Sequence, residues 1–290
     1  MSIIIENLSK VINGKKILDD ISFTIPKNKI TGLLGKNGAG KSTIMSILTE
    51  NLEKTSGKIY LSDQKKIEKK NIGYLSENNP LYQEMYALEF LEFIAKIYHV
   101  PKSIIPERCK SVLEKCSLLD KKNFKVKNLS RGYKQRLGIA KTIIHDPEIL
   151  ILDEPTSGLD FQNIIDVRNL ILSIAKTKTV LISSHIMEDI EEMCQEIILI
   201  NNGKIQYDSQ NLSEEKNSII YMKISTKNEN SLNSLDPLLA KSSILKKNND
   251  AILLKATYSV NEAIIEVLPL LSSLNIEVKK ITFSPVQKFF

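Results

Sequence analysis

The loop from Gly35 to Thr43 constrains the fold of this chain more than any other stretch, because it matches the phosphate-binding pattern G-x-x-x-x-G-K-S/T. An apolar strand is predicted just before it, at 30–34, and a helix just after it, from residue 44. Strand, glycine loop and helix together form the context that this pattern requires. The expected nucleotide-binding residues of the loop are Gly35, Lys36, Asn37, Gly38, Ala39, Gly40, Lys41, Ser42 and Thr43.

Each residue type in this loop has a chemical reason. The glycines let the backbone turn its N–H groups toward an anion, and the following helix points the positive end of its dipole at the same place. Lys41 is expected to reach the outer phosphates as a point charge, and the Ser42 hydroxyl to ligate an Mg²⁺ that bridges them. A glycine turn that binds nothing explains neither the spacing nor the Lys-Ser pair, so a triphosphate is predicted here.

The order of the predicted elements indicates an α/β fold with a mostly parallel sheet, an antiparallel edge and an inserted helical block. The antiparallel edge is expected within 1–25, where apolar residues alternate. The helical block is expected at about 81–140, where apolar residues recur at helical spacing. Further strands are predicted at 58–61, 71–75, 149–152, 179–182 and 197–200, and further helices at 161–176 and 187–193.

Two unequal domains are predicted, at 1–208 and 209–290, because the chain of 290 residues exceeds the usual size of one domain. The sequence becomes more polar beyond residue 208, and 211–217 is a plausible linker. The second domain is expected to be a small α+β fold without a chemical motif. Its predicted strands lie at 219–224, 251–256 and 276–281, and its predicted helices near 232–239 and 260–271.

The composition is that of an ordinary globular protein with a mild positive charge. The excess of 40 Lys and Arg over 34 Asp and Glu does not argue for nucleic acid, although it suits a protein near an anionic membrane. The basic run 65–70 is interpreted either as a solvated loop or as an electrostatic contact with lipid headgroups or a partner. We expect a soluble, unexported chain, because the sequence contains neither a span of about 18–20 apolar residues nor a signal-type N-terminus.

The cysteines predict a reducing compartment. Cys109 and Cys116 are expected on one helix, about 10 Å apart along its axis, which is too far for a disulfide. Cys194 has no obvious partner either. All three are interpreted as buried thiols.

The stretch 129–136, LSRGYKQR, identifies a resemblance to a known family. It is similar to the LSxGxxQR signature of ABC ATPases, and with the glycine loop it makes residues 3–208 resemble the ATP-binding subunit of an ABC transporter. The resemblance implies that Ser130 and Gly132, at a helix start, contact the γ-phosphate held by the opposite subunit of a dimer. Read without the family, this stretch predicts only the start of a helix.

The acidic end of the strand 149–152 resembles the Walker B segment of the same family. The resemblance implies that Asp153 faces the Mg²⁺ opposite Ser42, and that Glu154 orients or deprotonates an attacking water. Two acids after a strand are normally a solvated strand end. The continuous apolar run before them and the stretch PTSGLD after them argue against that interpretation here.

Two further positions match the family. Asp160 ends a segment that resembles the D-loop, which joins the two active sites of the dimer. His185 follows two serines at the end of the next strand and matches the switch histidine that senses the γ-phosphate. His99 and His145 match no motif and are interpreted as surface or helix-packing residues.

The chain departs from the family pattern at three positions. Ile12 stands where the family usually has an aromatic residue that stacks on adenine, and an aliphatic side chain offers no π-face. Glu77 stands where a Gln commonly links Mg²⁺ to the helical block, and its carboxylate can still accept a hydrogen bond from metal-bound water. Lys36 replaces a common Pro and adds positive charge at the mouth of the loop.

The sequence therefore predicts an ATP-hydrolysing subunit that dimerises around ATP and Mg²⁺ and drives export through a separate membrane-spanning permease. The residues 77–82 and the form of the signature look most like the branch that includes gliding-motility and drug-exporter subunits. Such a subunit is expected in the cytoplasm, peripheral on the inner face of the membrane. Two alternatives are a soluble ABC ATPase acting on ribosomes or DNA, and a non-catalytic ATP-binding regulator suggested by Ile12 and Glu77.

Overall fold

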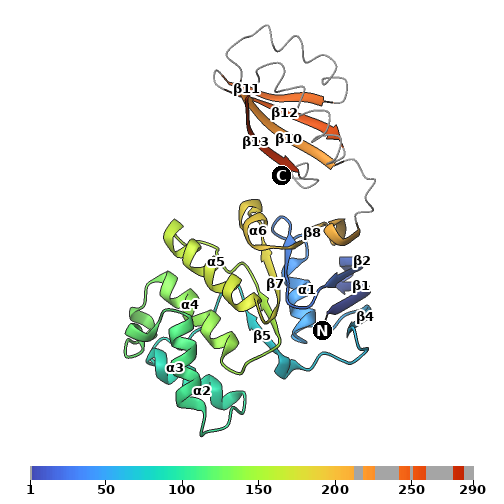
Figure 1. The fold of residues 1–290 in the computed structure, drawn as a ribbon. Coiled ribbons are helices and arrows are strands. Elements are labelled where there is room, and N and C mark those ends of the chain that lie inside the picture. Colours follow the sequence, from blue (N-terminus) through green and yellow to red (C-terminus); the bar gives the residue numbers. More distant parts are fainter. Residues whose placement is uncertain (1, 212–217, 226–241, 249–250, 259–276, 284–290) are drawn as a thin grey trace. The chain divides into compact units, whose positions relative to one another are not determined.

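The computed structural model describes residues 2–211, 218–225, 242–248, 251–258 and 277–283. The chain divides into two compact units, Met1–Ser209 and Gln210–Phe290. Figure 1 shows the helices of the first unit packed around a central sheet. All residues of the predicted nucleotide site belong to this first unit.

A six-stranded sheet forms the centre of the first unit, in the order β5-β6-β7-β3-β8-β9. Neighbouring strands are parallel except for β9, which runs antiparallel to β8. Strands β3, β6 and β7 are buried along their whole length, as expected of parallel strands covered on both faces. The strands are β3 (Ile30–Leu34), β5 (Ile72–Leu75), β6 (Ile149–Leu152), β7 (Thr179–Ser184), β8 (Glu196–Asn201) and β9 (Lys204–Asp208).

The predicted antiparallel strands near the N-terminus form a sheet of their own, in the order β2-β1-β4. The sequence placed them at the edge of the main sheet, whose antiparallel edge is instead β9. Asn13 and Gly14, both with positive φ, make the tight turn that pairs the first two strands. The buried faces of this sheet and of helix α1 share one hydrophobic core. The strands are β1 (Ile3–Ile12), β2 (Lys15–Ile25) and β4 (Ser56–Leu61).

Six α-helices are seen in the described part of the first unit. Three of them form the predicted helical block, and Figure 1 shows these three grouped to one side of the sheet. Pro106 stands in the first turn of its helix, where a missing N–H costs nothing. The helices are α1 (Lys41–Leu48), α2 (Ala87–Ile97), α3 (Ile105–Lys115), α4 (Arg131–Ile143), α5 (Phe161–Ala175) and α6 (Met187–Met193).

The described strands of the second unit form one antiparallel sheet, in the order β11-β12-β10-β13. Three of the four were predicted, whereas β11 was not. The predicted linker residues 212–217 and the predicted helices near 232–239 and 260–271 lie outside the described residues. The strands are β10 (Ser218–Ser225), β11 (Ser242–Asn248), β12 (Ala251–Tyr258) and β13 (Glu277–Phe283).

The helix lengths, the buried cysteines and the basic run of the described residues each bear on an expectation from the sequence. Among the described helices, none is long and apolar enough to cross a membrane. Burial raises the pKa of the Cys109 thiol to about 11 and that of Cys116 to about 12. In the basic run 65–70, Lys66 pairs with Glu50 at 2.8 Å on the surface.

Candidate active site

The phosphate loop ends in a helix start that is open to an anion. Gly40 caps α1 with φ 114°, a left-handed conformation that favours glycine, and no side chain of the described residues caps the first N–H groups. A Cβ on Gly40 would approach the Leu18 side chain to 2.7 Å. The loop can therefore offer backbone N–H groups and a positive dipole end to a phosphate.

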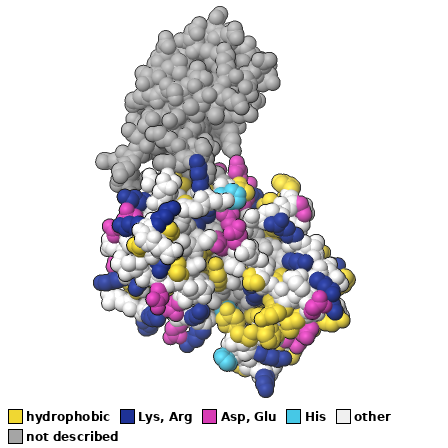
Figure 2. All heavy atoms as spheres, turned by 180° about the vertical axis from the view of Figure 1, so that it is seen from behind, with side chains coloured by type: hydrophobic (Ala, Val, Ile, Leu, Met, Phe, Trp, Pro, Cys, Tyr) yellow, Lys and Arg dark blue, Asp and Glu magenta, His cyan; other side chains and the backbone are white. Residues whose placement is uncertain are grey.

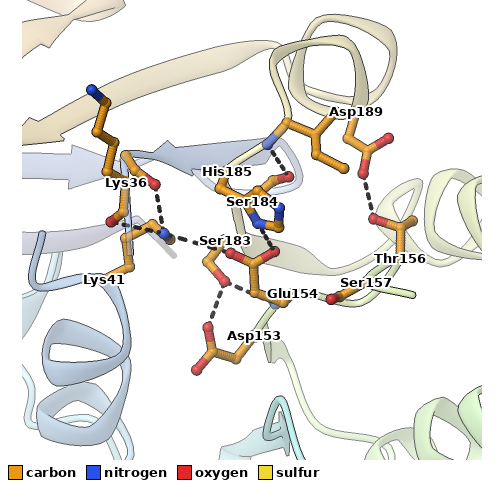
Figure 3. A network of polar contacts seen from close by, with 12 residues as sticks. Lys36, Lys41, Asp153, Glu154, Thr156, Ser157, Ser183, Ser184, His185 and Asp189 are labelled. Carbon is orange, nitrogen blue, oxygen red and sulfur yellow. Dashed lines mark hydrogen bonds and ion pairs between the residues drawn. The ribbon is translucent and has the colours of Figure 1, made fainter. Parts of the chain in front are cut away.

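Lys41 is buried at the start of α1, with 5% of its surface exposed. Its Nζ donates to the carbonyl oxygen of Gly35 at 2.6 Å and lies 3.5 Å from Oε1 of Glu154. Figure 3 shows the ammonium group pointing along the loop toward this carboxylate. A phosphate bound in the loop would meet a cation that is already aimed at it.

The two acids after β6 are fixed by one serine from the neighbouring strand. The Ser183 hydroxyl donates to Oδ1 of Asp153 at 2.5 Å and accepts from the backbone N–H of Glu154 at 2.8 Å. Glu154 adopts φ 50°, an unusual conformation for a residue with a side chain. Both acids are more than nine-tenths buried, so their carboxylates have little freedom to move.

His185 lies beside the second acid, just beyond the end of β7. Its Nδ1 is 2.8 Å from Oε2 of Glu154, and 42% of its side chain is exposed. The carboxylate of Glu154 is thus held between the histidine on one oxygen and Lys41 on the other (Figure 3). A carboxylate in that position can accept a proton from a water that attacks a phosphate in the loop.

The residues predicted to hold Mg²⁺ have the right donor chemistry for it. Ser42 is exposed at the start of α1, Asp153 is buried, and Glu77 is exposed after β5. Burial, together with the charges of Asp153 and Glu77, raises the pKa of Tyr74 to about 12, so both acids lie close to one phenol. Hydroxyl and carboxylate oxygens are ligands that Mg²⁺ prefers, with phosphate oxygens completing the shell.

The signature residues and Asp160 form a second cluster. Ser130 caps α4 by accepting from the N–H of Tyr133 at 3.4 Å, and Asp160 caps α5 by accepting from the N–H of Asn163 at 3.0 Å. A Cβ on Gly132 would lie 2.0 Å from the Asn163 side chain. Hydrogen bonds from Asn163 lower the pKa of Asp160.

This second cluster is separate from the first within one chain. Among the contacts of the described residues, none joins Ser130, Gly132 or Asp160 to Lys41 or Glu154. The start of α1 therefore offers a site for an anion beside Lys41 and the acids, whereas the start of α4 makes no direct contact with these groups.

Three contacts at the site were missed by the sequence interpretation. Gln135 donates to the carbonyl oxygen of Pro155 at 2.7 Å, and Asn79 donates to the carbonyl oxygen of Lys134 at 3.0 Å. Ser183 entered the sequence interpretation only as one of the two serines before His185. Its place at the end of a buried strand, in line with the acids, was the signal that could have identified it.

The departures from the family pattern are all at the surface. Ile12 is 39% exposed at the end of β1, and Lys36 is exposed in the phosphate loop. Because Ile12 is exposed, a base has room to pack against it. The aliphatic side chain of Ile12 offers no π-face for stacking.

Comparisons with known proteins bear on the family and the fold of this chain. A family model described as "ABC transporter" matches residues 18–157. An uncharacterized ABC transporter ATP-binding protein of Bacillus subtilis, YhcH, is 33% identical over 98% of this chain and 93% of its own length. The chain belongs to the ABC transporter ATP-binding proteins. It is therefore an ATPase with the ABC-type cassette fold.

Other ABC proteins match the first unit. The lantibiotic transport ATP-binding protein SrtF of Streptococcus pyogenes is 40% identical over 74% of this chain and 96% of its own length. The structure of CbiO1 from Clostridium perfringens, part of the ABC transporter complex CbiONQ, matches with a TM-score of 0.65 and 27% identity. That match covers 71% of this chain and 87% of CbiO1. The dimeric structure of the cassette MJ0796 has the same fold, with a TM-score of 0.64 and 22% identity, over 71% of this chain and 97% of the cassette.

Proposed function

We propose that this chain is the ATP-hydrolysing subunit of an ABC exporter. Two copies bind ATP between them and drive a separate membrane-spanning partner. The observation that carries the proposal is the position of Glu154, between Lys41 and His185 at the phosphate loop. The SrtF relative, whose name describes lantibiotic transport, supports a transport role.

The groups at the loop divide the chemistry between them. The N–H groups of α1 and the ammonium of Lys41 hold the β- and γ-phosphates, and Glu154 takes the proton from the attacking water. His185 holds the other carboxylate oxygen and faces the γ-phosphate. Ser42 and Asp153 would hold Mg²⁺, and Glu77 could contribute a further oxygen ligand or hydrogen bond to it. When bound, the ion would supply positive charge beside the phosphates.

The second copy supplies the other half of the site. Ser130 and Gly132 mark an anion-binding helix start that lies apart from Lys41 in the same chain. In a symmetric pair, each copy places this helix start against the γ-phosphate held by the other, and Asp160 lies between the two sites. The dimeric structure of the cassette MJ0796, which has the same fold, supports a pair of this kind.

The helical block offers a surface for the membrane-spanning partner. Tyr82, Ile97 and Tyr98 are 58%, 52% and 40% exposed, and Figure 2 shows hydrophobic side chains gathered low on that face. Ile97 and Tyr98 also line a cavity of about 310 Å³, together with Lys141, whose pKa burial lowers to about 8. An exposed apolar surface of this kind favours a protein partner, which holds the subunit at the inner face of the membrane.

The test replaces the acid that takes the proton. Glu154→Gln is expected to lower the ATPase rate at least about 100-fold while ATP still binds, because the amide cannot accept the proton. With ATP, this variant is expected to elute as a dimer in size-exclusion chromatography. The matched control is Glu148→Gln, which makes the same change at the exposed residue just before the same strand and is expected to keep the rate.

Two outcomes would contradict the proposal separately. Equal ATPase rates in the wild type and Glu154→Gln would remove the assigned role of this acid. A Glu154→Gln protein that stays monomeric with ATP at high concentration would remove the shared site.

A further inference from the structure

A buried acid outside the site described above connects two of its segments. Asp189 lies on α6, four residues after His185, and is 2% exposed. One carboxylate oxygen accepts from the hydroxyl of Thr156, and the other accepts from the guanidinium of Arg168. Figure 3 shows the contact with Thr156 beside the histidine and Glu154.

The burial of this charge needs an explanation. An ionised carboxylate loses its hydration in the interior, so it is stable there only when both oxygens are paired. Here the two partners come from different elements, since Thr156 follows β6 and Arg168 lies on α5. Thr156 is itself 3% exposed, and it stands two residues after Glu154. The acid therefore connects the loop that carries Glu154 to the helix that follows His185.

The contact between Glu154 and His185 lies between two such connections. At the strand ends, Ser183 bonds to Asp153 and to the backbone of Glu154. At the other end, the carboxylate of Asp189 bonds to Thr156. With both ends fixed, the loop and the segment 183–189 cannot separate or slide without breaking a buried polar contact.

We propose that Asp189 is a positioning residue for ATP hydrolysis. Through Thr156 and Arg168 it sets the spacing between the segment that carries Glu154 and the segment that carries His185. The carboxylate takes no proton from water and touches no phosphate. This inference rests on the roles of Glu154 and His185 under the proposed function.

The test removes one hydroxyl and leaves the carboxylate in place. Asp189→Ala would leave Arg168 buried without its partner and risks unfolding the chain, so Thr156 is the better site. Thr156→Val keeps the shape but cannot donate, and we expect it to lower kcat at least about tenfold, with KM for ATP within about twofold. Thr156→Ser restores the hydroxyl and is expected to return kcat to within about threefold of the wild type.

A matched control uses the other arm of the same arginine. Arg168 also bonds to Glu192, whose side chain is 61% exposed. Glu192→Gln changes a surface contact and is expected to keep kcat, because exposed ion pairs contribute little. A loss in Glu192→Gln as large as that in Thr156→Val would show that the packing of α6, and not the buried connection, matters.

A double-mutant cycle separates positioning from general stability. If Thr156 acts through the pair of Glu154 and His185, then Thr156→Val should cost little more once His185 is replaced by Ala. Additive losses, or a Thr156→Ser protein as impaired as Thr156→Val, would overturn the inference. If Glu154→Gln abolishes turnover while Thr156→Val does not, this inference fails and the proposed function stands.

Discussion

The strand ends at the phosphate loop and the helical block differ in how far their side chains are exposed. At the strand ends, Lys41 and Glu154 are buried and held by contacts from neighbouring elements. In the helical block, Tyr82 and Ile97 are more than half exposed, although α2 and α3 bury a core of their own. Groups that react must stay fixed, whereas a surface that meets a partner must be reachable. The proposed function thus assigns the chemistry to the first region and the recognition of a partner to the second.

Side-chain contacts join the two regions near both ends of α4, the helix that begins with the signature residues. At its start, Gln135 bonds to the carbonyl of Pro155, just after the acids. Beyond its end, His145 stacks on Tyr98 with ring centroids 3.7 Å apart, and its Nε2 lies 3.2 Å from the carbonyl oxygen of Ile72 in β5. Substitutions in either region test whether the strand ends carry the chemistry and the helical block does not.

The largest effect is expected at the strand ends, where Lys41 lies. Lys41→Ala should lower ATP binding and the ATPase rate at least about 100-fold, because no other buried cation of the described loop faces the phosphates. The thermal midpoint should change far less than the activity. Nucleotide titration and calorimetry measure both, with Lys110→Ala, an exposed lysine on α3, as the control. Normal ATP binding in Lys41→Ala would contradict the assignment of phosphate binding to this lysine.

A smaller effect is expected at the start of the signature helix. Ser130→Ala should lower the ATPase rate about tenfold or more but leave ATP binding to a single copy intact, since Ser130 lies apart from Lys41. Mixing this variant with Lys41→Ala creates dimers with one intact shared site. An equal mixture should recover about a quarter of the wild-type rate. If the mixture recovers no ATPase activity, Ser130 does not act on the ATP held by the other copy.

At the junction of the two regions, where His145 contacts Tyr98 and Ile72, the expected effect is on the free energy of unfolding and depends on pH. Burial lowers the pKa of His145, so the folded chain binds fewer protons than the unfolded chain once the pH falls below the ordinary histidine value of about 6.5. Its contribution to stability is therefore present above that pH and lost as the pH falls through the lowered pKa. His145→Phe should lose less unfolding free energy than the wild type between pH 7 and pH 5.

Urea unfolding at the two pH values measures this difference. Carboxylates titrate in both proteins, so only the difference between the two proteins is compared. The same acid sensitivity in wild type and variant would mean that the junction does not depend on the charge of the ring.

The smallest effect is expected from thiol reagents. The raised pKa values of Cys109 and Cys116 and their burial in the helical block predict that neither reacts with a maleimide at pH 7.5 in the folded chain. Mass spectrometry should find both labelled only after denaturation. Rapid labelling of either would show that the helical block opens more readily than its packing indicates.

Local patterns predicted the parts of the molecule that depend on neighbouring residues. Helix α6 has the predicted bounds, and β6 delivers the two acids as its apolar run indicated. Strand β9 was missed although Asn202-Gly203, a pair typical of hairpin turns, preceded it. That signal was present in the sequence and was not used.

Other features depend on contacts between distant segments and leave no local pattern. Asp189 stands in a polar helix whose pattern predicts solvent exposure, yet it is buried and its carboxylate pairs with Arg168 of α5. Asn79 adopts φ 40° and packs against Gly138, where a Cβ would lie 2.3 Å from its amide. No spacing along the chain connects either pair, so tertiary structure was needed to find them.

The backbone of Glu154 has a consequence for how this chain can change over time. A side chain held at φ 50° costs about 1–3 kcal/mol relative to glycine, so the fold is less stable than it could be at the residue to which the proposed function assigns the proton transfer. In a descendant that no longer needed turnover, Glu154→Gly would relieve this strain and would be favoured by selection for stability alone. Persistence of the acid at this position is therefore a sign that hydrolysis is still under selection.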